Sequence, residues 1–411
     1  MKILSLGRYA FSICAAAAML ADCNSGALQS VLSPSAGVNG AGQVRFVQGL
    51  ARRYRVVFRF HPSDGEHPRA DLIVLHGTLY GTTYSGGANR TGTVFSLTTA
   101  GTESVLHSFA GTIGSGDGAY PAAALTALHG TLYGTTPFGG GSNGDGTVFS
   151  VTTGGTERAI YSFQGGDGAY PRASLTAVNG TLYGTTNEGG ANGYGAVFRV
   201  TTAGKERTLY SFKGGSDGAY PYARLIDVGG TLYGTTIVGG ARCGYGQYPY
   251  GCGTVFSIST NGVEKVLYSF AGGSDGALPS AGLIDVGGTL YGTTGGGSSS
   301  GDGTVYSIST SGAEKVLYSF AGGSDGAQPG AGLVNVKGTL YGTTSSGGPS
   351  DNGTVFSIST SGEERVLYRF RGGSDGASPN GLIYMNGTLY GTTIEGGTQG
   401  KGKGTVFALT P

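Results

Sequence analysis

The sequence has few of the residues that usually carry chemistry. Its 411 residues include no Trp, 3 Met, 4 Cys and 5 His. Charged residues make up 12% of the chain, and the formal net charge is +1. A chain this close to neutral offers no broad basic surface for nucleic acid or for an anionic membrane. We therefore expect no nucleic-acid partner.

The sparse reactive residues also lack the spacings of known catalytic motifs. No segment has the pattern of a Ser-His-Asp triad, a phosphate-binding loop or a strong zinc site. The histidines all fall in the first third of the chain: His61, His67, His76, His107 and His129. Most carboxylates recur once per repeat of the sequence, as scaffold residues do. We expect no catalytic residue, no cofactor and no metal, and we expect a monomer.

Glycine is the residue in excess, with 84 copies. It does not recur at every third position, which excludes a collagen helix. The chain is 38% hydrophobic with 25 Tyr and 17 Phe, too apolar for a solvated coil. Six glycines recur in each copy of the repeat described below, and we expect them at or beside turns and strand ends.

The first 53 residues differ in composition from the rest. A basic start and the apolar stretch YAFSICAAAAMLA predict a signal peptide over residues 1–23. Leu20-Ala21-Asp22-Cys23 resembles a bacterial lipobox, although Asp22 stands where a small residue is usual. Lipidation of Cys23 and full secretion therefore stay open as alternatives. Residues 24–53 are rich in Ser, Gly and Ala and predict a flexible linker. We expect the protein to be exported to a bacterial periplasm, cell surface or medium.

Residues 54–411 are built from seven near-identical repeats of about 50 residues. The motif Gly-Thr-Leu-Tyr-Gly-Thr-Thr begins at Gly77, Gly130, Gly180, Gly230, Gly288, Gly338 and Gly387. Each copy holds four short segments rich in Thr, aromatic and β-branched residues, separated by turn residues, which predicts four strands. We name them A (after Asp-Gly-Ala), B (Thr-Leu-Tyr-Gly-Thr-Thr), C (Gly-Thr-Val-Phe) and D (Val-Leu-Tyr-Ser-Phe). Strands C and D carry apolar residues on both faces, so each sheet should lie between two neighbours.

Four strands in a repeat of this length predict a β-propeller blade, with a linear β-solenoid as the alternative. The ends of the array favour the propeller. Residues 54–60 form a spare D strand, whereas the last repeat stops at its C strand, residues 404–411. A ring closed by the N-terminal strand gives seven complete four-stranded blades and hides both edges. We predict an all-β, seven-bladed propeller.

The pattern GTLYGTT, GG, GTVFSIST, EKVLYSF and GGSDGA is similar to the tandem GloVer-type repeat of bacterial extracellular proteins. The resemblance covers residues 54–411. It implies an exported repetitive protein with varied anchors, and it supplies no activity. The layout also resembles kelch repeats, without their Trp.

In such a propeller, loops B–C and D–A open on one face, and the B–C loops vary most between copies. Variable loops on a repeat scaffold concentrate on the binding face. The longest B–C loop lies in blade 4 and contains Cys243 and Cys252, which we expect to form a disulfide in an exported protein. The same face is expected to hold a ligand-binding group in blades 2–4: Tyr120, Tyr170, Tyr220, Glu188, Tyr194, Tyr245, Tyr248 and Tyr250.

Asp-Gly recurs seven times in the D–A loops, at Asp64, Asp117, Asp167, Asp217, Asp275, Asp325 and Asp375. One carboxylate per loop is unlike the dense pattern of a calcium loop, so we expect structural turns.

Three functions remain open from the sequence. The first is a non-enzymatic propeller that binds a glycan or a protein through its variable loop face. The second is a cell-envelope enzyme, a lyase or hydrolase, since propellers host many activities. The third is a purely structural surface protein.

Overall fold

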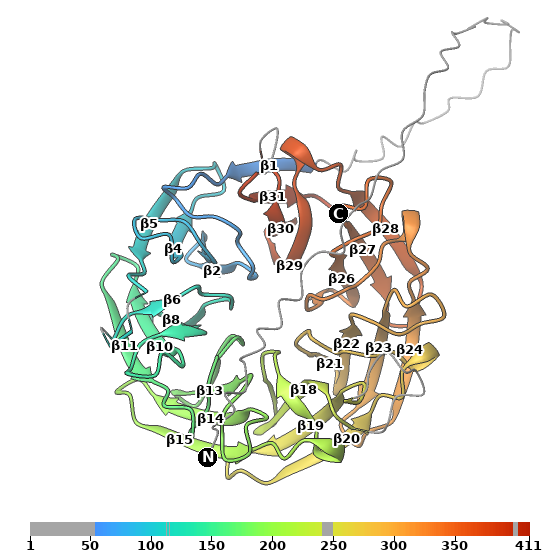
Figure 1. Cartoon of the computed structure of the whole chain (residues 1–411). Coiled ribbons are helices and arrows are strands. Elements are labelled where there is room, and N and C mark those ends of the chain that lie inside the picture. The colour runs from blue at the N-terminus through green and yellow to red at the C-terminus, as the bar shows by residue number, and fades with distance from the viewer. Residues whose placement is uncertain (1–53, 112, 115, 241–249, 398–401) are drawn as a thin grey trace, which may run out of the picture. The chain divides into compact units, whose positions relative to one another are not determined.

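The computed structural model describes residues 54–111, 113–114, 116–240, 250–397 and 402–411. The expected signal peptide 1–23 and linker 24–53 lie outside this range. The described residues form seven antiparallel blades around one axis, confirming the all-β propeller (Figure 1). None of the helices within these residues is long and apolar enough to span a membrane.

Blades 1–6 run from an inner to an outer strand in chain order, and blade 7 takes its outer strand from the N-terminal end of the described residues. The A strands are β2 (Ile73–Leu75), β7 (Thr126–Leu128), β12 (Thr176–Val178), β17 (Ile226–Val228), β21 (Ile284–Val286), β25 (Val334–Val336) and β29 (Ala377–Met385). The B strands are β3 (Thr78–Thr83), β8 (Thr131–Thr136), β13 (Thr181–Thr186), β18 (Thr231–Val238), β22 (Thr289–Thr294), β26 (Thr339–Thr344) and β30 (Thr388–Glu395).

The outer half of each blade repeats with the same regularity. The C strands are β4 (Thr93–Leu97), β10 (Thr147–Thr152), β14 (Ala196–Thr201), β19 (Thr254–Ser259), β23 (Thr304–Ser309), β27 (Thr354–Ser359) and β31 (Thr405–Leu409). The D strands are β5 (Glu103–Ser108), β11 (Glu157–Ser162), β15 (Glu206–Ser211), β20 (Glu264–Ser269), β24 (Glu314–Ser319), β28 (Glu364–Arg369) and β1 (Tyr54–Arg59).

Short elements occupy the D–A and B–C loops. The strands are β6 (Gly118–Ala119), β9 (Phe138–Gly139) and β16 (Ala219–Pro221), and the 3-10 helices are η1 (Gly215–Asp217), η2 (Gly273–Asp275), η3 (Gly323–Asp325) and η4 (Gly373–Asp375).

The N-terminal strand closes the ring as the sequence predicted. The last sheet has the order β1-β31-β30-β29, with Tyr54 opposite Leu409 and Arg59 opposite Thr405. Its register shifts by one residue between Val56 and Phe58, and the other six C–D pairs have the same irregularity at the equivalent position. Strand β1 therefore pairs in blade 7 with the same geometry as the D strands of blades 1–6, whose four main strands are consecutive in the sequence.

The core lies between the blades, and each described cluster spans one seam. At the seam of blades 3 and 4, Val197 and Phe212 pack with Phe256 and Ile258. Across each seam two aromatic rings meet edge to face, as Phe212 and Phe256 do at 5.1 Å. This arrangement explains why both faces of strands C and D are apolar, and it confirms the sandwiched sheets.

One recurrent glycine has a different role from the one expected. Gly134 lies inside β8, neither at a turn nor at a strand end. A Cβ there would lie 2.5 Å from the ring of Phe149 and 3.1 Å from Leu125. Glycine at this position therefore makes room for the core aromatic residue of strand C, which the turn-based expectation missed.

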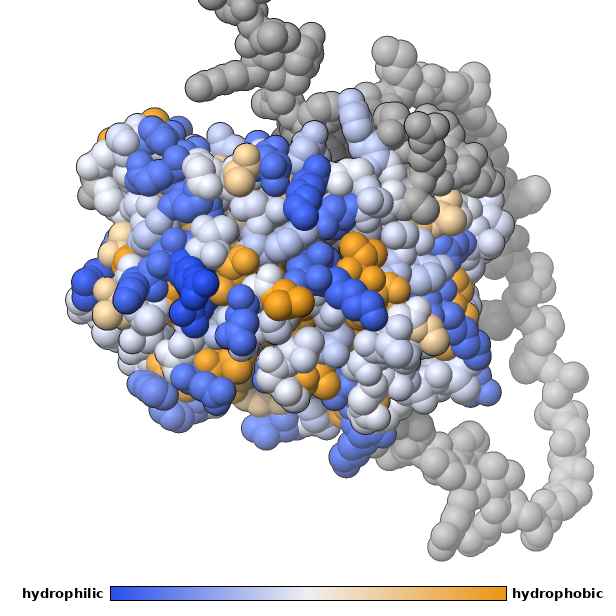
Figure 2. All heavy atoms as spheres, turned by 90° about the horizontal axis from the view of Figure 1, so that it is seen from below, coloured by the Kyte–Doolittle hydropathy of each residue, from blue (hydrophilic) through white to orange (hydrophobic). Residues whose placement is uncertain are grey.

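The outer wall of the ring is mixed in polarity. Figure 2 shows small apolar groups separated by hydrophilic side chains. The exposed large hydrophobic residues are scattered over different parts of the ring: Val74 lies on the inner strand β2, Ile113 in a D–A loop and Val263 in a C–D loop.

Candidate functional site

The B–C and D–A loops pair with each other on one face of the ring, which we call the loop face. Antiparallel bridges join Glu66 to Ser85 in blade 1, and Ala169 to Glu188 in blade 3. Equivalent bridges occur in blades 5 and 6. This confirms that the two kinds of loop open on the same side.

One residue of each D–A loop lies over the seam between two blades. These seven seam residues all have φ between 52° and 58°: His67, Tyr120, Tyr170, Tyr220, Leu278, Gln328 and Ser378. A left-handed backbone at a residue other than Gly costs about 1 kcal/mol or more. Because all seven blades share it, this conformation belongs to the scaffold.

Hydrogen bonds hold each seam residue between two loops. The N–H of Tyr120 donates to Thr91 O of the preceding blade at 2.7 Å. The Tyr170 carbonyl accepts from the Asn187 N–H of its own blade at 3.1 Å. The backbone thus fixes where the seven side chains emerge, and only their chemistry varies.

In the first blades these side chains join a continuous chain of rings. The ring centroids of Tyr84 and Tyr120 are 5.2 Å apart, those of Tyr120 and Phe138 are 6.0 Å apart, and those of Phe138 and Tyr170 are 5.3 Å apart. Further on, Tyr194 and Tyr220 meet edge to face at 6.0 Å. We call these six residues the aromatic arc.

Charged side chains flank the aromatic arc. The Arg69 guanidinium lies 4.0 Å from the ring centre of Tyr84, and that of Arg172 lies 5.6 Å from the ring centre of Phe138. Both positions favour a cation–π attraction.

At the other end of the aromatic arc, Tyr220 lies among other predicted residues. Burial raises the pKa of Tyr220, and the neighbouring Glu188, Tyr194 and Tyr250 raise it further. Tyr194 and Tyr250 are 39% and 76% exposed, so this end of the aromatic arc is open to a ligand.

The structure brings together most of the predicted binding residues. Tyr120 and Tyr170 belong to one run of rings, and Tyr220, Glu188, Tyr194 and Tyr250 cluster at its far end. Sequence reasoning missed Tyr84, which extends the arc into blade 1, and Phe138 of blade 2, which joins Tyr120 to Tyr170. Both lie in B–C loops, whose variability was the signal that could have found them.

The remaining predictions in blade 4 concern its long B–C loop. Cys243, Tyr245 and Tyr248 lie outside the described residues. Cys252 is fully buried beside Val255 and Phe270. The disulfide between Cys243 and Cys252 stays a prediction.

The axial channel contains a cavity of about 420 Å³, lined by the A strands of blades 1–4 and by Arg224. Asp71 is at the position of blade 1 equivalent to Arg224. Burial raises the pKa of Asp71, and the positive charge of Arg224 opposes that shift. The two side chains therefore attract one another within the ring.

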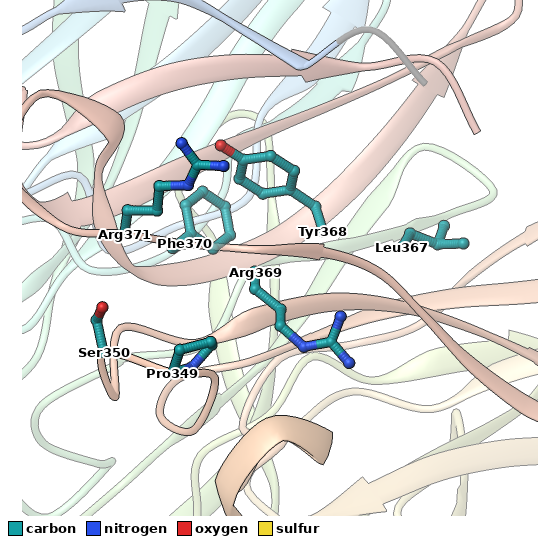
Figure 3. Close-up of a pocket in the computed structure, with 7 residues that line it drawn as sticks. All are labelled: Pro349, Ser350, Leu367, Tyr368, Arg369, Phe370 and Arg371. Atoms are coloured by element: carbon teal, nitrogen blue, oxygen red, sulfur yellow. The ribbon is translucent and has the colours of Figure 1, made fainter. Parts of the chain in front are cut away.

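A second cavity, of about 510 Å³, lies on the outer rim of blade 6 beside β28 (Figure 3). Two of its polar side chains make hydrogen bonds within the protein. The Tyr368 hydroxyl donates to Asp375 at 2.6 Å, and Arg369 donates from Nε to Ser324 O at 2.8 Å. Figure 3 shows Tyr368 and Arg369 on opposite sides of the strand. This cavity carries no site that we can assign.

Comparison with known proteins identifies the family of the repeat. The model of the Gloeobacter/Verrucomicrobia repeat matches residues 16–249 and 244–407, most of the sequence. The chain belongs to this family. No curated protein was found to match this sequence.

Several solved structures are similar to this Gloeobacter/Verrucomicrobia repeat protein. A puromycin hydrolase is 13% identical, with 80% of this chain and 50% of that chain covered at a TM-score of 0.52. A gluconolactonase from Xanthomonas campestris is 12% identical, with 64% and 78% covered at 0.39. A luciferin-regenerating enzyme is 11% identical, with 88% and 95% covered at 0.44. The likeness to the puromycin hydrolase, at this identity, shows the fold alone.

In this repeat protein five of the seven Asp-Gly loops have the structural role that the sequence predicts. Asp325 accepts hydrogen bonds from the Ala321 N–H and the Tyr318 hydroxyl, both at 2.8 Å. The same pair of bonds, from the backbone and from the D-strand Tyr, occurs at Asp167, Asp217, Asp275 and Asp375. Each of these carboxylates therefore fastens a loop to its own D strand.

A glutamate from the next blade approaches the loop Asp at six of the seven seams. Burial first, and then the charge of the nearby Asp, raise the pKa of these glutamates to about 7: Glu103, Glu157, Glu206, Glu264, Glu314 and Glu364. At the seam of blades 6 and 7, Tyr54 replaces the glutamate. Its ring stacks on Tyr368 at 3.9 Å, and its hydroxyl donates to Asp375 O at 2.5 Å.

Proposed function

We propose that this protein is an exported, non-enzymatic propeller that binds an extended glycan along the aromatic arc. The observation that carries the proposal is the continuous run of rings from Tyr84 to Tyr170, extended by the pair Tyr194 and Tyr220. Export rests on the N-terminal leader of the sequence.

The chemistry of the aromatic arc suits a sugar ring. Tyrosine offers a rigid apolar face and a hydroxyl, and it loses little conformational entropy on binding. The apolar face of a pyranose packs on such rings, while its hydroxyls need hydrogen-bond partners. Half-buried rings that support one another are already held in place, which lowers the entropic cost of binding.

Polar groups of both signs line the arc. Arg69 and Arg172 stand near its first rings, and Glu188 near its last. These groups can donate to and accept from sugar hydroxyls without forming a strongly charged surface. A neutral or weakly charged glycan fits this balance better than a polyanion does.

The test replaces two tyrosines of the aromatic arc with the polar residues that other blades carry at the same seam position. Tyr120→Ser and Tyr170→Gln copy Ser378 and Gln328, which have the same backbone conformation. Binding of the wild-type protein is screened on a glycan array and measured by calorimetry with the selected soluble glycan. We expect about tenfold weaker binding for each substitution, because one lost ring contact is worth about 1–1.5 kcal/mol.

The matched control is Gln328→Ser, which exchanges two residues that already occur at seams. It should leave affinity unchanged. Capture of protein rather than glycan would support the protein-binding alternative, and unchanged affinity in both Tyr variants would contradict the proposal. Turnover of the glycan, lost in Asp71→Asn, would support the enzyme alternative.

A further inference from the structure

Two seams depart from the Tyr–Asp arrangement. The D strand β1 carries Phe58 at the position of the Tyr, and the other departure lies between blades 1 and 2. Five D strands place a Tyr hydroxyl against the loop Asp, for example Tyr210 to Asp217 at 2.6 Å. In β5 the equivalent residue is His107, and its Nε2 lies 3.5 Å from Asp117 Oδ1. An imidazole thus takes the place of the phenol.

The glutamate of the next blade completes a group of three. His107, Asp117 and Glu157 each offer one ligand atom, and these atoms all lie within 4.8 Å of one another. His107 lies in β5, Asp117 in the loop after β5, and Glu157 in β11. The strands β5 and β11 are the D strands of two adjacent blades (Figure 1). Among the described residues, no other group of three His, Cys, Asp or Glu side chains has this geometry.

His107 Nε2 and Glu157 Oε1 are both hidden from solvent, and neither makes a hydrogen bond of normal length. Nε2 lies 3.5 Å from Asp117 Oδ1, which is an ion-pair distance. The Oε1 atoms of Glu103, Glu264, Glu314 and Glu364 are hidden in the same way, so the histidine is what distinguishes this seam. A buried polar atom with contacts this weak is unfavourable. A bound cation would satisfy both atoms at once.

The surrounding contacts hold the group in position. Asp117 Oδ2 accepts from the Ala110 N–H at 2.5 Å, and Oδ1 accepts from the Gly118 N–H at 2.9 Å. The His107 ring packs edge to face on Phe109, with centroids 4.8 Å apart. Such outer contacts are what orient the ligands of metal sites.

The distances and donor types favour zinc. Ligands at about 2.0–2.1 Å from a tetrahedral ion are separated by about 3.3–3.4 Å, close to the His107–Asp117 spacing. One imidazole and two carboxylates suit Zn²⁺ better than Ca²⁺, which prefers six to eight oxygens. We propose that His107, Asp117 and Glu157 bind one divalent transition-metal ion of the Zn²⁺ type at the seam of blades 1 and 2.

The main test variant gives blade 1 the residue that the repeat has at this position in other blades. This substitution, His107→Tyr, copies five other D strands, so the variant should fold. The full chain is purified without a histidine tag, stripped with a chelator and titrated with Zn²⁺ by calorimetry. We expect one Zn²⁺ per wild-type chain, a Zn²⁺-dependent rise in melting temperature, and loss of both in His107→Tyr.

Two further variants keep the test sharp. Glu157→Gln should weaken Zn²⁺ binding at least tenfold and does not depend on the folding of His107→Tyr. His129→Asn removes a turn histidine, copying Asn179 and Asn386 of other repeats, and should leave binding unchanged. Absence of Zn²⁺ binding in the wild type, or stoichiometric binding retained in His107→Tyr, would overturn the proposal in favour of a simple His–carboxylate ion pair.

Discussion

Blades 1–4 and blades 5–7 share one backbone and differ in the side chains that they present. The seam residues Tyr220 and Gln328 have φ of 58° and 57°, and both donate from N–H to the preceding B–C loop. The aromatic arc nevertheless lies wholly in blades 1–4. Leu278, Gln328 and Ser378 stand at the same positions in the other region.

In a repeat protein, the residues that depart from the repeat are the candidates for function. Residues that recur in every copy build the seams, the turns and the loop anchors. Residues that depart from the repeat, such as Tyr120 and His107, occupy positions that the scaffold already supports. Each departure therefore has a natural control in another blade of the same molecule.

The largest effect should come from opening the seam where the two regions meet at β1. Deleting residues 54–60 removes the D strand of blade 7 and the buried ring of Phe60. We expect the melting temperature to fall by about 10 °C or more, measured by calorimetry. A smaller change separates strand loss from ring loss: Phe60→Ala should cost about 3–5 kcal/mol.

Phe320→Ala is the matched variant in an internal seam, where Phe320 meets Phe356 as Phe60 meets Phe95. Equal losses in the two variants would mean that the closing seam is as strong as an internal one. An unchanged melting temperature after the deletion would contradict closure by β1.

The next effect is on the pH dependence of stability. It should come from the seams that carry a half-buried glutamate and not from the seam that carries Tyr54 in its place. Glu314 faces Asp275 and Tyr268, and Glu364 faces Asp325, Tyr318 and Arg369. Their pKa is raised to about 7, so the folded protein holds protons that the unfolded chain releases near pH 4.5. Stability should therefore fall as pH rises from about 4.5 through 7, measured as melting temperature at pH 5 and pH 8.

The double variant Glu314→Gln with Glu364→Gln removes two of these protons. It should show a smaller drop between the two pH values and a higher melting temperature at pH 8. An identical pH profile for wild type and variant would show that these glutamates are fully solvated. Chelated buffers keep any metal at His107 from contributing.

The smallest effect on stability is expected from extending the aromatic region into the plain one. Gln328→Tyr copies Tyr220 onto a backbone that already has the required φ. The free energy of unfolding, measured by calorimetry, should change by less than about 0.5 kcal/mol, since the site lies at the surface. Glycan affinity should stay equal or rise; a large loss of stability would mean that the seams are not interchangeable.

The fold was predictable because the sequence contains seven copies of the same four-strand pattern. The strand order, the sevenfold ring and the closure by residues 54–60 followed from the repeated motifs and from the mismatch at the two ends. The role of Gly134 was not predictable, because it depends on a ring contributed by the neighbouring strand. Only the packed blade shows that Phe149 occupies the space above it.

The candidate site was predictable in part. Tyr120, Tyr170 and Tyr220 stood out because they break the repeat at one position. The contact of Phe138 with both neighbours depends on how two loops pair, and a single sequence does not give that geometry. The grouping of His107 with Asp117 and Glu157 was missed because they lie in three separate segments, and only the adjacent blades bring them together.

The pairing of β1 with β31 also sets the order in which the molecule can be completed. Tyr54 and its partner Asp375 are 321 positions apart, so the first strand of the ring meets its place only after the last blade has formed. Contacts at such separation are slow to form, and an unpaired strand edge is open to wrong partners meanwhile. The closing step therefore makes this propeller dependent on an intact C-terminus: a chain truncated before Thr405 leaves its opening strand without a partner.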